Sequence, residues 1–348
     1  MKYLKYLLFL LLIAIIAIAI YIAVQPNDFS VSRTRTIQAP ASLIYNEVID
    51  FKNWEDWNAW TEEKPEMTIN YPEQTKGIDG SYSWIDNGET GTMRTIDTNP
   101  NKSITQTMQF ADYPSSDVVW TFMPNADGST DVKWTISGKD LPFGFKAYAA
   151  FTGGMDSKIG PYYDRSLELL DQKVVKSMTI YNIKVNGVTQ HSGGFYLYNT
   201  TSSKIENFKV KMQQMLPEVK QYLTDNNIKP SGAPFIIYHK WDLENNAVIF
   251  SCAMPTSDRV ITTDSEILTG QLEPFDALKT TLKGNYTHLE EAWNTAMKYQ
   301  TDINLVPDKT GVALEVYVTD PSNTPNPADW ITEIYLPIVL ENNTTLNH

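Results

Sequence analysis

The sequence predicts an α+β protein in which an N-terminal transmembrane helix precedes two soluble domains. Three observations support this prediction. An uninterrupted apolar run occupies residues 6–24. Several short segments of alternating polarity follow, and one long helical segment closes them. The remaining half contains a helix followed by two strands, and this order occurs twice. With 348 residues, the chain is long enough for two domains of ordinary size.

The apolar run covers nineteen consecutive residues from Tyr6 to Val24, which is long enough to cross a bilayer as a helix. Lys2 and Lys5 precede it, and positive charge on this side favours an orientation with the N-terminus inside. The alternative is a cleavable signal peptide, although the residues around Pro26 form a poor cleavage site. We therefore expect residues 1–27 to form an uncleaved signal anchor. The soluble domains would then lie on the extracytoplasmic, periplasmic side of a bacterial membrane.

The composition excludes several classes of function. The chain carries 28 basic and 41 acidic residues, so its net charge is −13 and it repels phosphate backbones. We therefore expect no nucleic-acid partner. Cys252 is the only cysteine, which rules out an intrachain disulfide. The 4 histidines are scattered without metal-ligand spacing, and we expect neither a metal site nor a bound cofactor.

Residues 28–175 form the first predicted soluble domain. A strand leads into a short helix, because apolar residues first alternate and then follow helical spacing. Turns rich in Asn, Gly and Pro separate five further strands, and a long helix closes the domain. The first strand and helix cover 29–38 and 42–49, the later strands cover 80–85, 91–97, 102–110, 117–124 and 129–137, and the long helix covers about 161–175.

The segment 37–45, together with Trp54, Trp57 and Trp60, resembles the START-like polyketide-cyclase (SRPBCC) family. The resemblance implies a helix-grip fold, in which an antiparallel sheet curves around the long C-terminal helix and leaves a cavity for a hydrophobic ligand. Trp57 is then a candidate ligand-binding residue. The alternative is that the three tryptophans plug one end of the sheet. We expect residues 140–155 to form an apolar loop that gates the cavity, packs in the interior, or touches the other domain or the bilayer.

Residues 176–348 form the second predicted domain, and an internal repeat organises it. In the first copy a helix over 203–226 precedes strands over 235–238 and 247–255, and in the second a helix over 287–300 precedes strands over 312–317 and 330–339. The repeat predicts a duplicated βαββ unit whose two sheets meet at a groove. Aligning Tyr238 with Tyr317 and Pro255 with Pro337 places Ser251 opposite Glu333, so only the second copy carries a carboxylate at that strand position.

Two segments of this half, 283–293 and 330–338, resemble the GyrI-like effector-binding domain, an AraC-type and SOUL-like family that binds small molecules. The resemblance covers nearly all of the second domain and implies that Glu333 is the central acid of a ligand cleft. The aromatic residues that could form the walls of this cleft are Tyr286, Trp293, Tyr317 and Tyr335. A carboxylate among aromatic rings binds cations, because the opposite charge and the ring faces both attract them. The alternative is that Glu333 pairs with a nearby Lys or Arg.

The sequence thus favours a membrane-anchored small-molecule-binding protein. The first domain would hold a hydrophobic ligand, and the second would hold a cationic or aromatic ligand at Glu333. Two alternatives stay open. Glu333 could be the general base of a hydrolase that acts on a reactive small molecule. The domains could also be structural or interaction modules whose pockets have closed. The sequence indicates no particular protein partner.

Overall fold

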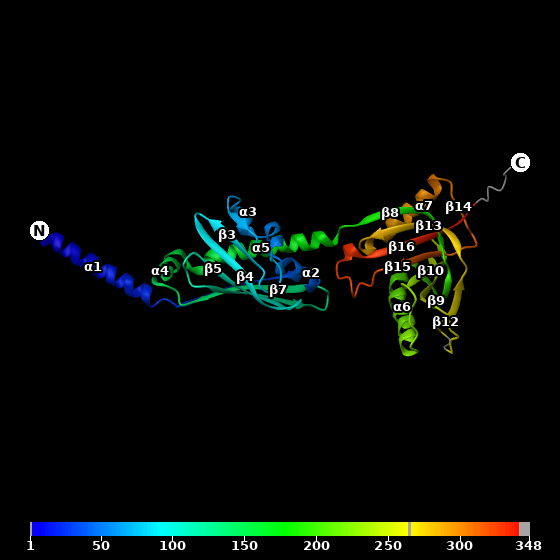
Figure 1. Cartoon of the computed structure of the whole chain (residues 1–348), viewed down its shortest axis with the longest axis horizontal. Helices are drawn as coiled ribbons and strands as arrows, with labels where there is room; N and C mark the ends of the chain where they lie inside the picture. The colour runs from blue at the N-terminus through cyan, green and yellow to red at the C-terminus, as the bar shows by residue number, and fades with distance from the viewer. Residues whose placement is uncertain (1, 264–265, 341–348) are drawn as a thin grey trace. The chain divides into compact units, whose positions relative to one another are not determined.

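The computed structural model describes residues 2–263 and 266–340. They form two compact units, Met1–Ser177 (unit 1) and Met178–His348 (unit 2), and we describe each by itself. Both units are α+β and each contains one antiparallel sheet, of seven strands in unit 1 and nine in unit 2 (Figure 1). This agrees with the predicted α+β class, but unit 2 has one continuous sheet where the repeat predicted two sheets that meet at a groove.

Unit 1 begins with α1 (Lys2–Ala23), an α-helix made almost entirely of Leu, Ile, Ala and aromatic residues. The part from Tyr3 to Ala23 is long and apolar enough to cross a membrane, and only 6% of its most apolar window is buried by the rest of the protein. A helix that is apolar on all sides and unburied is typical of a signal sequence or an anchor. Ile22, at its end, is the only residue of the described helix that is buried.

The seven-stranded sheet of unit 1 has the order β1-β7-β6-β5-β4-β3-β2. Its strands are β1 (Asp28–Ile37), β2 (Thr68–Asn70), β3 (Ser81–Asp86), β4 (Glu89–Asn99), β5 (Ser103–Phe110), β6 (Ser116–Pro124) and β7 (Thr130–Lys139). The long strands β3 to β7 follow the predicted ranges closely. In β4, β6 and β7 buried residues alternate with more exposed ones, and tight turns separate the strands. Three short helical segments, α2 (Ala41–Ile49), η1 (Phe51–Asp56) and α3 (Ala59–Glu63), connect β1 to β2.

The long helix α5 (Gly154–Met178) packs on this sheet. Tyr163, Leu167, Leu170 and Val174 recur at helical spacing on its buried side, and each is at most 2% exposed. The helix begins seven residues before Pro161, the position at which the sequence predicted its start. Pro161 is the eighth residue of α5, past the first turn, so it removes the intrahelical hydrogen bond to the Ser157 carbonyl and favours a kink at this point.

A second helix, α4 (Phe143–Thr152), occupies the segment that the sequence predicted to be a loop. None of its residues is buried, and it lies against α1. It ends at Gly153, whose φ of +88° is favourable only for glycine and allows the chain to turn into α5.

Unit 2 contains the order strand, helix, strand, strand twice, as β9-α6-β10-β11 and β13-α7-β15-β16 (Figure 1). Its strands are β8 (Asn182–His191), β9 (Gly194–Lys204), β10 (Phe235–Asp242), β11 (Ala247–Thr256), β12 (Leu268–Leu272), β13 (Phe275–Lys283), β14 (Val306–Pro307), β15 (Ala313–Tyr317) and β16 (Ile331–Val339). Its helical segments are η2 (Ile205–Asn207), α6 (Phe208–Asp225), η3 (Tyr286–His288), α7 (Leu289–Asp302) and η4 (Pro327–Asp329).

The sheet of unit 2 has the order β12-β9-β11-β10-β15-β16-β13-β8, with β14 added beside β16. The strands at the two ends of this order are β12 and β8. Two residues connect β8 to β9, which lies beside β12, and two residues connect β12 to β13, which lies beside β8. His191 pairs with Phe275 before the bend and Gly194 pairs with Leu272 after it, in the same register. The paired segments β8–β9 and β12–β13 are therefore two long antiparallel strands that bend together at a corner.

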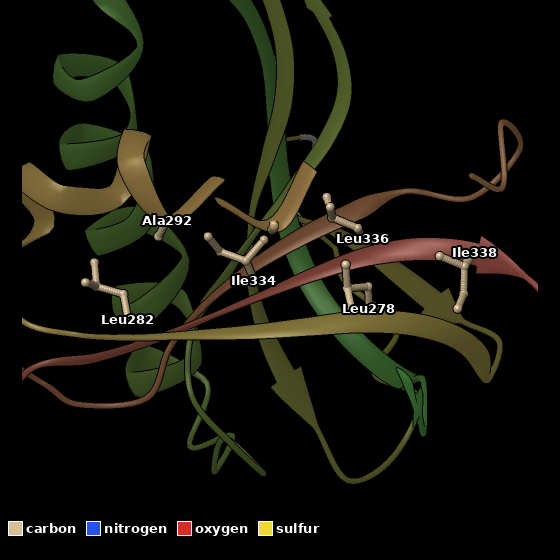
Figure 2. Close-up of a cluster of buried hydrophobic side chains, with 7 residues drawn as sticks. Leu278, Leu282, Ala292, Ile334, Leu336 and Ile338 are labelled. Atoms are coloured by element: carbon tan, nitrogen blue, oxygen red, sulfur yellow. The ribbon is translucent and has the colours of Figure 1, made fainter. Parts of the chain in front are cut away.

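The helices α6 and α7 cover one face of this sheet. Under α7, the side chains of β13 and β16 form an apolar core with Ala292 (Figure 2). The core residues are Leu278, Leu282, Ala292, Ala296, Ile334, Leu336 and Ile338, and each is at most 7% exposed. A neighbouring core lies under α6 and includes Met215, Ile236, Phe250 and Cys252. The other face of the sheet carries a separate cluster around Phe235, Ile237 and Leu314.

Candidate functional site

The most unusual group in unit 2 is the carboxylate of Glu315, in the short central strand β15. Side chains alternate along a strand, so Leu314 and Val316 join the cluster on the open face. Ala313 and Tyr317 point the other way, to the cores under α7 and α6. Glu315 has the same parity as these two residues. It therefore lies between the sheet and the helices and is only 2% exposed.

Three side chains from three different elements donate hydrogen bonds to Glu315. Trp293 of α7 donates from Nε1 to Oε2 at 2.6 Å, and Tyr238 of β10 donates from its hydroxyl to Oε2 at 3.3 Å. Tyr317, two residues away on the same strand, donates from its hydroxyl to Oε1. Within the described residues, no Lys, Arg or His forms an ion pair with Glu315. The acid is thus held only by neutral donors.

The environment changes the protonation equilibrium of the site. Burial raises the pKa of the Glu315 carboxyl above its ordinary value, and the hydrogen bonds from Tyr317, Trp293 and Tyr238 only partly offset this. Burial, reinforced by the nearby carboxylate, also raises the pKa of Tyr238 and Tyr317 well above that of a free tyrosine. Both tyrosines therefore remain neutral donors at physiological pH.

Further aromatic rings surround these three donors. The ring of Tyr238 meets Trp293 edge-on at a centroid distance of 5.2 Å, and Phe208 of α6 lies 5.6 Å from Tyr238. Tyr286, just before α7, meets Tyr317 edge-on at 5.3 Å. Phe208 and Tyr286 are both partly exposed. The buried acid is therefore separated from solvent by aromatic rings, which can attract a cation through their faces.

Glu333, the acid that the sequence analysis placed at the centre of the cleft, occupies a different environment. Val316 pairs with Glu333 across β15 and β16, so Glu333 is on the sheet face opposite to Glu315. Its Oε1 lies 2.7 Å from Nζ of Lys279, and its Oε2 accepts a hydrogen bond from the Tyr335 hydroxyl at 2.7 Å. Glu333 is thus paired with a lysine, which is the alternative that the sequence left open.

The physical reason is the register of β13 against β16. Tyr335 pairs with Lys279 and Glu333 pairs with Thr281, which places Lys279 diagonally across from Glu333 on the same face. The structure thus separates the predicted residues into two groups. Tyr286, Trp293 and Tyr317 gather around Glu315, and Tyr335 stays with Glu333 and Lys279 on the other face.

The internal repeat contains a signal that identifies Glu315. Tyr238 pairs with Phe250 across β10 and β11, and Tyr317 pairs with Thr332 across β15 and β16. Phe250 and Thr332 are equivalent positions when Pro255 is aligned with Pro337, so the two strand pairs have the same register when Tyr238 is aligned with Tyr317. The same alignment places Ile236 opposite Glu315. Ile236 is fully buried in the core under α6. A carboxylate at a position where the other copy has a core isoleucine indicates a buried acid.

In unit 1, Trp57 lies in the centre of the core and has no exposed surface. Its ring meets Trp120 and Trp134 edge-on at 5.9 and 6.3 Å, and those two rings stack at 4.2 Å. Trp134 in turn stacks on Tyr163 of α5 at 3.6 Å. The tryptophans therefore occupy the space between the sheet and α5.

Several polar groups in this aromatic core have no hydrogen-bond partner. They are Nε1 of Trp57, Nε1 of Trp134, Nε2 of Gln106 and Oγ1 of Thr95. Thr95 and Gln106 face each other across β4 and β5, and the Gln106 side-chain oxygen accepts a hydrogen bond from Trp120 at 3.3 Å. An unpartnered buried donor is costly, so a cluster of them is unusual in a core.

No protein-family model matches the sequence, and no curated protein sequence is detectably similar to it. The C-terminal half resembles the EcmrR C-terminal domain, at 15% identity over 46% of this chain and 99% of that one, with a TM-score of 0.40. A protein from Chromobacterium violaceum is 19% identical over 43% of this chain and 98% of its own, with a TM-score of 0.31. A conserved protein of unknown function from Enterococcus faecalis is 18% identical over 43% and 73%, with a TM-score of 0.30.

Proposed function

We propose that unit 2 is a small-molecule-binding module that recognises the cationic group of an aromatic ligand with Glu315. The observation that carries this proposal is the buried carboxylate held by three neutral donors, with no ion-pair partner among the described residues. A buried charge without a counter-ion is unfavourable by several kcal/mol. A ligand that supplies the missing positive charge removes this penalty. A neutral ligand of the same shape does not.

The surrounding rings favour the same class of ligand. Tyr238, Trp293 and Tyr317 offer apolar faces close to the acid, and a delocalised organic cation gains cation–π attraction from such faces. Tyr286 and Phe208 are partly exposed and lie outside the three donors. Rotation of these two rings would open a path to Glu315. Ligand binding would favour the ionised carboxylate, because the cation lowers the pKa that burial raises.

A thermal-shift experiment tests the proposal with a matched control in the same sheet. Tetraphenylphosphonium serves as the cation and triphenylphosphine oxide as a neutral compound of similar shape. We expect the cation to raise the unfolding midpoint of the full chain, because a ligand that binds only the native state stabilises it by about 2.7 kcal/mol at 100 times its Kd. Glu315→Gln should abolish the shift. Glu333→Gln should keep it, because Lys279 already neutralises that acid.

The reverse result would move the site to the opposite face of the sheet. If Glu333→Gln loses the response and Glu315→Gln keeps it, the original expectation for Glu333 holds and the present proposal fails. An equal response of both variants and the wild type would exclude an acidic receptor. The hydrolase alternative is checked with the same variants, since it requires turnover of a reactive ester that disappears in Glu315→Gln or Glu333→Gln.

The unpartnered groups in unit 1 favour a second binding function. We infer that a hydrophobic ligand that carries one hydrogen-bond acceptor enters between the sheet and α5 by displacing the tryptophan rings that fill this space. Trp57, Trp134 and Gln106 supply buried donors for such a group, and the aromatic rings supply the apolar surroundings. The test is quenching of tryptophan fluorescence by a spin-labelled fatty acid. Quenching should weaken in Gln106→Leu, and equal quenching in both proteins would contradict the inferred role of these donors.

We further propose that α1 is an uncleaved anchor that holds both units on the extracytoplasmic side of the membrane. Its length and its apolar surface on all sides support an anchor, and Lys5 at its N-terminal end supports this orientation. A reporter enzyme that is active only outside the cytoplasm, fused to the C-terminus, should be active. Activity of a cytoplasm-specific reporter at the same position would reverse the orientation.

A further inference from the structure

Helix α4 presents its apolar side to the outside of unit 1. Phe143 is 53% exposed, Tyr148 is 51% exposed and Phe151 is 65% exposed. Helices on the surface of a soluble domain normally bury their large apolar residues and expose charged ones. In α4 the arrangement is reversed, because none of its ten residues is buried and Lys146 is its only charged residue.

The exposed residues lie on one side of the helix. Phe143, Ala147 and Phe151 are spaced four residues apart and form a stripe, and Tyr148 lies next to it. Phe145 projects from the other side and packs on the protein. Its ring stacks on Phe29 of β1 at a centroid distance of 5.9 Å and meets Tyr113 edge-on at 5.5 Å. The helix is therefore fixed through Phe145, and its apolar stripe faces away from unit 1.

The start of α4 is tied to the end of α1. The backbone N–H of Leu141 donates to the carbonyl of Asn27 at 3.2 Å, and the Asn27 side chain donates to Asp140 at 3.3 Å. Asn27 follows the last residue of α1, Ala23, by four positions, which a chain can span with at most about 14 Å. The helices α1 and α4 also lie against each other. A membrane that contains α1 therefore has its surface at the level of α4.

We propose that α4 is an interfacial helix that inserts Phe143, Tyr148 and Phe151 into the same bilayer that α1 crosses. The proposal rests on the proposed anchor function of α1. The occupant of the apolar stripe is lipid, because the stripe continues the apolar surface of α1 and aromatic residues favour the interface between headgroups and acyl chains. With Lys146 as the only charge in α4, apolar contact drives the insertion, and a zwitterionic bilayer is sufficient.

Site-directed spin labelling of the full chain in phosphatidylcholine vesicles tests this proposal. The native Cys252 is buried, which raises the pKa of its thiol to about 12 and leaves it unreactive, so introduced cysteines are labelled selectively. Labels are placed by Tyr148→Cys and by Phe151→Cys. We expect both to collide several times more often with oxygen, which concentrates in lipid, than with a water-soluble nickel chelate.

Two further positions calibrate the measurement. Met123→Cys is a matched control, because Met123 is 50% exposed but lies at the other end of the β6–β7 hairpin. Its partner Asp131 is eight residues from Lys139, or about 26 Å along the strand, and α4 follows shortly after Lys139. This label should favour the nickel chelate. Ile13→Cys, in the middle of α1, should favour oxygen if α1 is in the membrane.

Each combination of results decides the question. If the label at Ile13 is in lipid while those on α4 behave like Met123, the anchor stands and the interfacial helix is refuted. If Ile13 is itself exposed to the chelate, both proposals fall. Labels on α4 that are shielded from both reagents would show that protein covers the stripe, which also refutes lipid contact. In Phe143→Ser, the label at Tyr148 should move toward water, and the near-UV spectrum of the tryptophan core should remain unchanged if unit 1 stays folded.

Discussion

Replacing Glu315 by glutamine should change the pH dependence of stability in a definite direction. Burial raises the pKa of Glu315 in the folded chain above the value in the unfolded chain, which is about 4.3. Below that pH the acid is protonated in both states and contributes no penalty. As the pH rises, the unfolded chain loses this proton first, and the folded state becomes relatively less stable until the pH passes the folded pKa.

The size of the effect follows from the linkage of one proton to unfolding. The difference in unfolding free energy between wild type and Glu315→Gln should change by at most about 1.4 kcal/mol per pH unit in this window. For a unit of this size, 1 kcal/mol corresponds to about 2–4 °C in the midpoint. The midpoint of the wild type should therefore fall relative to that of Glu315→Gln by at most about 3–6 °C per pH unit between pH 4.5 and the folded pKa.

Differential scanning calorimetry of the detergent-solubilised chain between pH 4.5 and 8 measures this difference. Other titrating groups are common to both proteins, so only the difference between the two midpoints is interpreted. Glu333→Gln provides the comparison for loss of a paired, partly exposed carboxylate, whose side chain is 21% exposed beside Lys279. If wild type and Glu315→Gln keep a constant separation across the whole range, Glu315 titrates at an ordinary pKa and the argument from burial is refuted.

Three further substitutions test the fold. Leu278→Ala, under α7, should lower the stability of unit 2 by about 2–5 kcal/mol in a denaturant titration and leave the unit 1 transition unchanged, because Leu278 has no exposed surface. Gly193→Ala should prevent β8–β9 and β12–β13 from bending together, since a Cβ there would lie 2.2 Å from the Leu272 carbonyl oxygen. Gly128→Ala is the control: nothing lies within 4 Å of its Cβ, so only its positive φ should lower the free energy of unfolding, by about 1–2 kcal/mol. Equal melting points of the two variants would contradict this. Lys279→Gln should cost about 1 kcal/mol or less by the same titration, because its ion pair with Glu333 is partly solvated.

Much of the sheet in unit 1 was predictable because buried and more exposed residues alternate along β4, β6 and β7. The observed β5, Ser103–Phe110, differs from the predicted range by one residue. The segment of α4 was not predictable in this way. Phe145 lies on the opposite side of the helix from Phe143 and Phe151, and no polar stripe separates them, so the usual helical signal is missing. Its exposed apolar residues fit the lipid contact that we propose for α4, whereas the usual pattern of an amphipathic helix assumes water on one side.

The candidate site shows a different limit of sequence reasoning. Both Glu315 and Glu333 lie in apolar strands, and their local sequences look equally suitable for a buried acid. The difference between them is set by strand pairing, because β13 places Lys279 beside Glu333 but brings no cation to Glu315. The register between distant strands is not visible in a local pattern. The aromatic candidates Tyr286, Trp293 and Tyr317 were drawn from the right segments but assigned to the other acid.

The place of β16 in the sheet has a consequence for biosynthesis. It is the last described strand, yet it sits between β15 and β13 and forms hydrogen-bonded ladders with both. While a ribosome is still making Ile331–Val339, these two neighbours expose unpaired backbone edges. Unit 2 can therefore complete its sheet only after Val339 has emerged from the ribosome. A nonsense codon or a protease cut shortly before Ile331 would leave β13 and β15 each with an unpaired backbone edge, and such a product would be prone to aggregate.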